Sequence, residues 1–430
     1  MGYGGISMSL ESKRIQIGNG IFLNLIKTDK FKSNLLSFYF TRPLIRKEVT
    51  LNALLPLVLK RGTRNYPTKL DIEKKLEENY GANLSIDVNK RGEKQVTRYT
   101  MEWVPETYLD NEDFNYEIIE ILKEIIYNPI LEDEAFNKEY VIQEKENLKR
   151  IIQGKINSKR SYAIDRCIEE MCKNERFSLY QLGYIEDLED IDEKKLYRHY
   201  QYILETSPIE IFYVGDYNND LVDFLKKENS IERKEIISIP DDQIIPSVQT
   251  KNMIQEELDV NQGKLVIGYR TGITFKDKLY DALLIGSNIL GGSPNSKLFK
   301  NVREKESLAY YISTSIFKYK SILFIDAGIE FDDFDKTVEI IKQELDNLRA
   351  GKFTEKDMDL SFKSLKASIE SIKDSIFLIS EYFFSQLLSG DNRNIEEVIQ
   401  GLSNVSKEEI IEVSNKIDID TIYFMKNKSQ

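Results

Sequence analysis

Histidine is almost absent from this chain of 430 residues, in which His199 is the only one. Catalytic zinc usually takes three protein ligands and keeps an open position for water, and histidine is the commonest of those ligands. A chain with a single histidine therefore cannot form a catalytic zinc site that needs two histidine ligands. His199 lies in the amphipathic segment KKLYRHYQYIL, and we expect it to have a structural role.

Cysteine is scarce as well, with only Cys167 and Cys172. They lie five residues apart in a stretch that reads as helix, and this spacing places them on different helix faces. A disulfide between them is not expected. The pattern is typical of a cytosolic chain with reduced thiols, so we expect a cytoplasmic protein.

The chain also lacks long apolar runs and an excess of basic residues. No stretch of about 18 apolar residues predicts a transmembrane helix. The N-terminal MGYGGISMSLESKR lacks a basic segment followed by an apolar one, so we expect no secretory signal, and Ile6 breaks the myristoylation pattern. The net charge of −12 argues against nucleic acid and anionic membrane as partners, and is compatible with basic peptides.

What the sequence does contain is an internal repeat in an ordinary globular composition, with 41% hydrophobic and 31% charged residues. FDKTVEIIKQELDNLRA echoes FNYEIIEILKEIIYN about 220 positions earlier, and TEKDMDLSFKSLKASIES echoes LEDEAFNKEYVIQEKENL. This offset is too long for a solenoid. It predicts an α+β protein made of two tandem homologous domains.

The domain bounds follow from changes in composition. We expect an N-terminal domain at 1–228, a connector at 229–256 with two prolines and mixed polar residues, and a C-terminal domain at 257–430. Within the first domain, IFLNLIK and NLLSFYF are predicted to be paired strands. A single long helix is predicted from about Glu132 to Lys173.

One stretch of the second domain, GGSPNSKLFKNVREKESLAYY, combines a helix end with a strand start. Gly291 and Gly292 are predicted to end one helix, and a second helix then carries Arg303 near its own end. Along the following strand, Leu308, Tyr310 and Ile312 are expected to alternate with Ala309 and Tyr311. Arg303 and Tyr310 together offer a fork of donors and a phenol, which suits a peptide carbonyl or an acidic group, although both side chains could serve only the fold.

The string SKLFKNVREKESLAYY resembles the second-domain motif of the pitrilysin/insulinase family of zinc metallopeptidases. The resemblance implies that Arg303 and Tyr310 bind substrate peptide and help to stabilise the tetrahedral intermediate. It also implies a fold of two α+β domains, each an antiparallel sheet with helices packed on it.

The resemblance also locates the catalytic helix of the family in KEVTLNALLPLVLKR. Anchored on the Gly62-Thr63 that follows, the HxxEH motif falls on Ala53, Pro56 and Leu57, so two zinc ligands and the general base are replaced by apolar residues. KEYVIQEKENLKR is similar to the segment that supplies the remaining zinc ligand, with Glu144 as its counterpart. Without histidine partners we expect Glu144 to be a solvated carboxylate on a helix face, and no metal in this chain.

The resemblance implies a function for a chain without the motif. In several branches of the family, an HxxEH subunit pairs with a homologue that has lost it, and the inactive half supplies the Arg/Tyr pair and half of a peptide chamber. This chain has the features of that inactive half, and it looks like the bacterial branch labelled as associated with modification of elongation factor P. We therefore expect a heterodimeric zinc peptidase with a peptide substrate and with zinc in the partner subunit. The chain is not expected to be an enzyme on its own.

Two other functions remain open at this point. The chain could be a purely structural subunit of the same fold, or a peptide-binding protein that works alone, for instance as a homodimer. A self-sufficient zinc peptidase is disfavoured because the ligands are absent.

Overall fold

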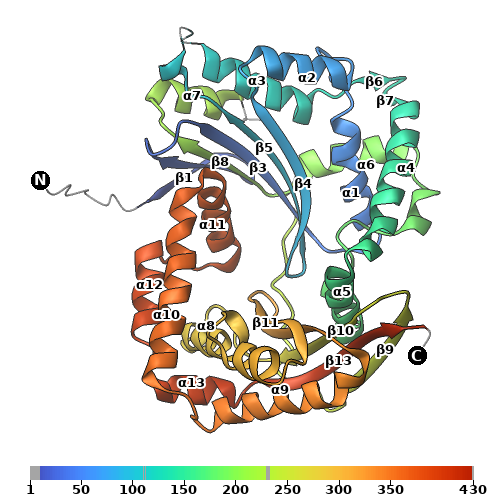
Figure 1. The fold of residues 1–430 in the computed structure, drawn as a ribbon. Helices are drawn as coiled ribbons and strands as arrows, with labels where there is room; N and C mark the ends of the chain where they lie inside the picture. Colours follow the sequence, from blue (N-terminus) through green and yellow to red (C-terminus); the bar gives the residue numbers. More distant parts are fainter. Residues whose placement is uncertain (1–9, 110, 112, 229–232, 429–430) are drawn as a thin grey trace, which may run out of the picture. The chain divides into compact units, whose positions relative to one another are not determined.

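The computed structural model describes residues 10–109, 111, 113–228 and 233–428, so the N-terminal nine residues and part of the predicted connector lie outside it (Figure 1). The chain forms two compact units, each assembled from separate stretches of sequence. Unit 1 takes the residues up to Gln153 together with Leu179–Pro240 and Lys373–Ser385. Unit 2 takes Gly154–Ser178, Asp241–Ile372 and the chain from Gln386 onward.

Unit 1 is built on a six-stranded sheet. Its strands lie in the order β1 (Ser12–Gly18), β2 (Ile21–Lys27), β8 (Ile209–Gly215), β3 (Asn34–Pro43), β5 (Lys94–Trp103) and β4 (Asn83–Arg91). Only β2 and β8 run parallel. The strands IFLNLIK and NLLSFYF form as predicted, but the prediction that they pair is wrong, because β8 from the end of the domain lies between them.

Helices cover this sheet mainly on one face. They are α1 (Val49–Leu59), α2 (Lys69–Glu78), α3 (Phe114–Tyr127), α4 (Lys138–Gly154), α6 (Glu193–Thr206) and α7 (Asn219–Glu228), with a short hairpin of β6 (Leu131–Glu132) and β7 (Ala135–Phe136) before α4. Leu36, Phe38 and Phe40 of β3 point into the core under these helices. Tyr39 points to the opposite face, as the two-residue period of a strand requires.

Unit 2 is built on a five-stranded sheet. Its strands lie in the order β11 (Ala309–Phe317), β12 (Ile322–Ile329), β10 (Gly263–Arg270), β13 (Asp418–Asn427) and β9 (Asn252–Leu258), and only β13 and β9 run parallel. Its helices are α5 (Lys159–Met171), α8 (Tyr280–Ser287), α9 (Phe334–Arg349), α10 (Glu355–Glu370), α12 (Ile395–Ser403) and α13 (Lys407–Ser414). The last residues of the predicted connector therefore already belong to β9.

The two sheets repeat one topology. Read from the parallel pair outward, β2-β8-β3-β5-β4 in unit 1 corresponds to β9-β13-β10-β12-β11 in unit 2. Helix α9 begins at Phe334, which lies 220 residues after Phe114 at the start of α3. The predicted α+β fold with two tandem copies is confirmed. The homologous-domain bounds of 1–228, 229–256 and 257–430 stay a prediction, because spatial compactness does not measure homology.

Each unit also contains a helix that comes from the other copy in the sequence. Helix α5 packs on the second sheet, where Cys167, Ile168 and Met171 lie in a buried cluster with Val266 and Phe324. The equivalent helix of the second copy, α11 (Ile376–Ser389), contributes its first residues to unit 1. The central strands β3 and β12 are buried on both faces, which explains why a strand such as SILFIDAGI reads as a continuous apolar run.

The prediction of a single helix from about Glu132 to Lys173 is wrong. The segment contains the β6–β7 hairpin and two helices, α4 and α5, separated by a short 3-10 turn at Lys155–Asn157. The break after Gly154 is also where the chain passes from unit 1 to unit 2.

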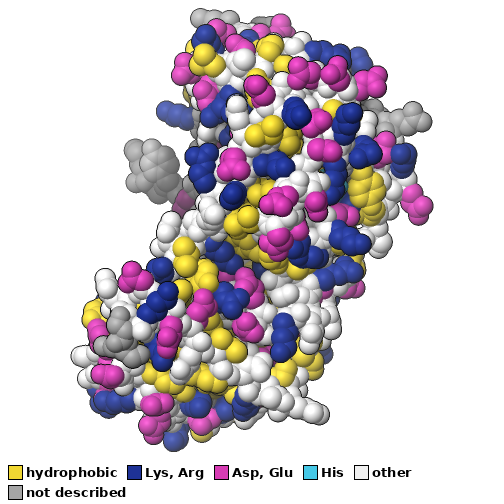
Figure 2. All heavy atoms as spheres, turned by 90° about the vertical axis from the view of Figure 1, so that its right-hand side faces the viewer, with side chains coloured by type: hydrophobic (Ala, Val, Ile, Leu, Met, Phe, Trp, Pro, Cys, Tyr) yellow, Lys and Arg dark blue, Asp and Glu magenta, His cyan; other side chains and the backbone are white. Residues whose placement is uncertain are grey.

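None of the helices in the part of the chain that the structure describes is long and apolar enough to cross a membrane. Figure 2 shows basic and acidic side chains interspersed over one face, with hydrophobic side chains between them. On this face the negative net charge is not gathered into one patch.

Candidate functional site

Helix α1, VTLNALLPLVL, is a core helix. Ten of its eleven residues are buried, and only Leu57 is partly accessible. A helix that is apolar on all sides belongs in a protein interior rather than at a surface. Pro56 lies within the helix, where it lacks the N–H that would bond to the carbonyl of Asn52. Ala53 is 2% exposed, so two of the three positions matched to the zinc motif serve packing.

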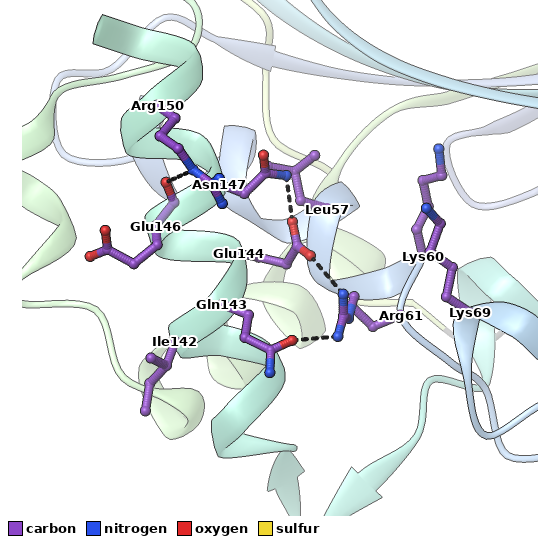
Figure 3. A pocket seen from close by; sticks show the side chains of 10 residues that line it. All are labelled: Leu57, Lys60, Arg61, Lys69, Ile142, Gln143, Glu144, Glu146, Asn147 and Arg150. Atoms are coloured by element: carbon purple, nitrogen blue, oxygen red, sulfur yellow. Dashed lines mark hydrogen bonds and ion pairs between the residues drawn. The ribbon is translucent and has the colours of Figure 1, made fainter.

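The third matched position, Leu57, lines a pocket of about 540 Å³ in unit 1 together with Glu144 of α4 (Figure 3). The structure therefore brings together two residues that lie 87 positions apart and that were matched to the zinc site separately. Lys60 and Arg61 extend from the end of α1 into the same pocket, and Lys69 enters it from the start of α2.

Glu144 is not the solvated carboxylate that we expected. It is 7% exposed, it accepts a hydrogen bond from Asn147 Nδ2 at 2.8 Å, and it forms an ion pair with Arg61 Nη1 at 3.4 Å. Arg61 also donates to Gln143 Oε1 at 2.5 Å, and its guanidinium lies 4.8 Å from the ring of Tyr140. A buried carboxylate is costly without a cation, and Arg61 supplies one.

The residues present do not fit a zinc ion. Ala53, Pro56 and Leu57 offer no donor side chain, and the carboxylate of Glu144 faces a guanidinium. No group of three or more His, Cys, Asp or Glu side chains suited to a metal occurs among residues 10–109, 111, 113–228 and 233–428. The guanidinium of Arg61 beside Glu144 would repel zinc, so this chain takes no zinc-dependent step.

His199 of α6 lies against the same core helix. Its Nε2 is 2.6 Å from Asn52 Oδ1, and Asn52 Nδ2 donates to Gln95 Oε1 at 2.7 Å. Burial and, secondarily, the charge of Arg42 lower the pKa of His199 to about 4. The ring is therefore neutral near pH 7 and holds α1, α6 and β5 together, in agreement with the predicted structural role.

Arg303 lies at the end of a wide, π-type helical turn, Phe299–Lys305. Leu298 and Val302 are fully buried and anchor this turn, while Arg303 is exposed. Its guanidinium lies 4.7 Å from the centre of the Phe299 ring, one turn earlier. The guanidinium thus lies against the Phe299 ring on an exposed part of the turn.

Tyr310 occupies a β-bulge in β11. Ala309 pairs with Ile329 and Tyr311 with Gly328, so Tyr310 is the extra residue. The expected alternation of Leu308, Tyr310 and Ile312 is therefore wrong: the two aliphatic side chains are buried, and Tyr310 is 59% exposed. A bulge re-aims one side chain without breaking the sheet.

The phenol of Tyr310 donates a hydrogen bond to Glu330 Oε1. This bond, together with the charge of Glu330, raises the pKa of Tyr310 above its ordinary value. Tyr310 is thus a protonated donor near pH 7. Leu308 N donates to Val302 O at 2.9 Å, and Ser307 adopts φ +55°, so a tight turn joins the Arg303 and Tyr310 elements.

Sequence reasoning missed the basic residues of the unit 1 pocket, which are Lys60, Arg61, Lys69 and Arg150. One signal was available: Arg61 follows Leu57 by four positions and therefore lies on the same side of the helical turn. The pairing of Arg61 with Glu144 needed the packing of α4 against α1, which no local pattern records.

Comparison with known proteins gives a consistent picture. The family described as "Peptidase M16 inactive domain" matches residues 190–365. The chain is 37% identical over 409 residues to the "Probable inactive metalloprotease YmfF" of Bacillus subtilis, which covers 95% of this chain and 96% of that protein.

Solved structures show the same fold. A conserved protein from Enterococcus faecalis matches with a TM-score of 0.90 and 29% identity, over 97% of this chain and 99% of that one. The peptidase M16 inactive domain from Pseudomonas fluorescens matches in fold with a TM-score of 0.80 and 14% identity, over 97% and 99% of the two chains. The chain therefore belongs to the pitrilysin/insulinase-type peptidase family, M16, as an inactive, protease-like member.

Proposed function

We propose that this chain is the non-catalytic subunit of a heterodimeric peptidase. It pairs with a homologue that carries the HxxEH motif, and it supplies Arg303 and Tyr310 to hold the substrate peptide. In such an assembly zinc is held by the partner, where it supplies the hydrolytic chemistry. This chain binds and orients the peptide and forms part of the wall around it.

The observation that carries the proposal is the exposure of Tyr310 at a bulge, in an otherwise well-paired strand. The bulge turns Tyr310 out to solvent, whereas Leu308 and Ile312 on either side of it are buried. Arg303 is exposed on the adjoining helical turn, so both donors face outward from unit 2. Donors that are aimed at a developing oxyanion contribute about 3 kcal/mol each to catalysis.

The test is the turnover of a peptide by the reconstituted pair. Arg303→Ala and Tyr310→Phe should each lower kcat by about 100-fold, while the two chains still co-elute. Tyr310→Phe removes only the hydroxyl, so its ring still fills the same place on β11.

Lys305→Ala is the matched control, because Lys305 is an exposed cation on the same helical turn as Arg303. It should leave kcat unchanged. Turnover that stays at the wild-type level in both Arg303→Ala and Tyr310→Phe would remove the proposed role.

A further inference from the structure

The pocket beside the altered zinc-motif positions is lined by more cations than anions. Lys60, Arg61, Lys69 and Arg150 give four positive charges, and Glu144 and Glu146 give two negative charges, so the lining carries +2. The whole chain carries −12. A local excess of positive charge in an acidic protein favours an anionic ligand at this place.

Two of these cations have no carboxylate partner among the residues that the structure describes. Arg150 Nε donates to the backbone carbonyl of Glu146 at 3.3 Å, and no ion pair engages Lys60. Lys69 is paired with Glu73 of its own helix at 3.4 Å, in an exposed contact of small energetic value. Arg61 already neutralises Glu144. The free positive charge of the pocket therefore belongs chiefly to Lys60 and Arg150.

The remaining lining has the character of a peptide site. Leu57 offers an apolar surface between α1 and α4, and Gln143 and Asn147 present side-chain amides from α4 (Figure 3). The volume of about 540 Å³ lies in the range of ligand pockets. A free peptide end combines a carboxylate, amide groups and a side chain in this small space.

We propose that this pocket binds the C-terminal carboxylate of a peptide, with Lys60 and Arg150 as the cations that recognise it and Leu57 beneath the last side chain. The inference rests on the peptide-binding role proposed above. The pocket beside the matched zinc positions then holds a peptide carboxylate where a metal would otherwise lie. The chain retains cleaved or short peptides by this C-terminal carboxylate.

The experiment uses the full chain alone and two fluorescein-labelled, alanine-rich peptides that end in leucine. One peptide carries a free C-terminal carboxylate and the other a C-terminal amide. Fluorescence anisotropy should show the carboxylate form binding about tenfold more tightly, with the difference shrinking as salt is added. Lys60→Gln and Arg150→Gln should each remove most of that preference.

Lys149→Gln is the control, because Lys149 lies next to Arg150 on α4 and does not line the pocket. It should keep the full preference. Arg61 is left unchanged, since its removal would strand the buried carboxylate of Glu144.

Equal affinity for the two peptides, loss of the preference in Lys149→Gln, or no binding of either peptide would each overturn this inference. Inorganic phosphate that displaces both peptides equally would assign the pocket to a free anion and would overturn it as well. None of these results bears on Arg303 and Tyr310, whose role is measured by the turnover of the assembled pair. The two proposals therefore fail separately.

Discussion

At the scale of single residues, two of the positions matched to the zinc motif belong to a packed core. Ala53 and Pro56 are buried, and the carboxylate of Glu144 faces Arg61 instead of a metal. The sequence predicted the loss of the ligands, because that required only the residue types. It did not predict the burial of Glu144, because its cation comes from another helix.

His199 gives the residue-scale prediction. Its pKa is about 4 in the folded chain and about 6.5 when unfolded, so the unfolded state binds the extra proton between these values. The contribution of neutral His199 to the free energy of unfolding is complete above about pH 6.5 and is lost as the pH falls toward 4. Between pH 7.5 and pH 5 we expect a loss of about 2 kcal/mol in the free energy of unfolding that comes from His199.

Urea denaturation of the wild type and of His199→Gln at both pH values measures this contribution. The variant cannot titrate there, so its stability should fall less than that of the wild type by about 2 kcal/mol. An identical fall in both proteins would contradict a neutral, buried His199.

At the scale of elements, the sequence records strong helical periods but not the breaks between elements. Helix α3 forms at Phe114–Tyr127 because its apolar residues recur at helical spacing and are buried together. The hairpin before α4 was missed because Asp133 and Glu134 both adopt positive φ, and Glu134 stands where such a turn usually has glycine. The bulge at Tyr310 was missed for a related reason, since nothing local distinguishes it from a regular strand.

A buried ionic cluster holds helix α5 in unit 2. The cluster is centred on Glu175, which follows the end of this helix. Glu175 Oε1 accepts from Arg270 Nη2 at 2.7 Å, and Glu175 Oε2 lies 2.7 Å from Lys320 Nζ. Arg270 Nε also donates to Asp420 Oδ2 at 2.8 Å, and all four side chains are at most 2% exposed. The cluster fixes the end of the exchanged segment to strands β10 and β13.

Glu175→Ala leaves two buried cations with too little negative charge. We expect it to lower the free energy of unfolding of the chain by roughly 3–5 kcal/mol, measured by urea denaturation. Asp359→Ala removes the carboxylate of an exposed pair with Lys363 and should cost less than about 1 kcal/mol. An equal loss in the free energy of unfolding for the two substitutions would show that the ionic cluster does not anchor the segment after α5.

At the scale of the whole molecule, the family membership and the two copies of one α+β topology were predictable from the sequence, because long motifs and a repeat record them. The exchange of α5 and α11 was not, since α-helical periodicity shows which face is apolar and not which sheet covers it. The two proposed sites also differ in how far the sequence alone could predict them. Arg303 and Tyr310 come from one continuous motif, whereas the cationic pocket is assembled from three helical segments.

We claim above all that this chain pairs with an HxxEH homologue. The most direct measurement is co-purification of the two chains expressed together, with the mass of the complex, its zinc content and its peptidase turnover determined on the same sample. The claim predicts a one-to-one pair with about one zinc and a turnover that neither chain has alone. A homodimer of this chain that excludes the homologue, or a homologue equally active without it, would contradict the claim.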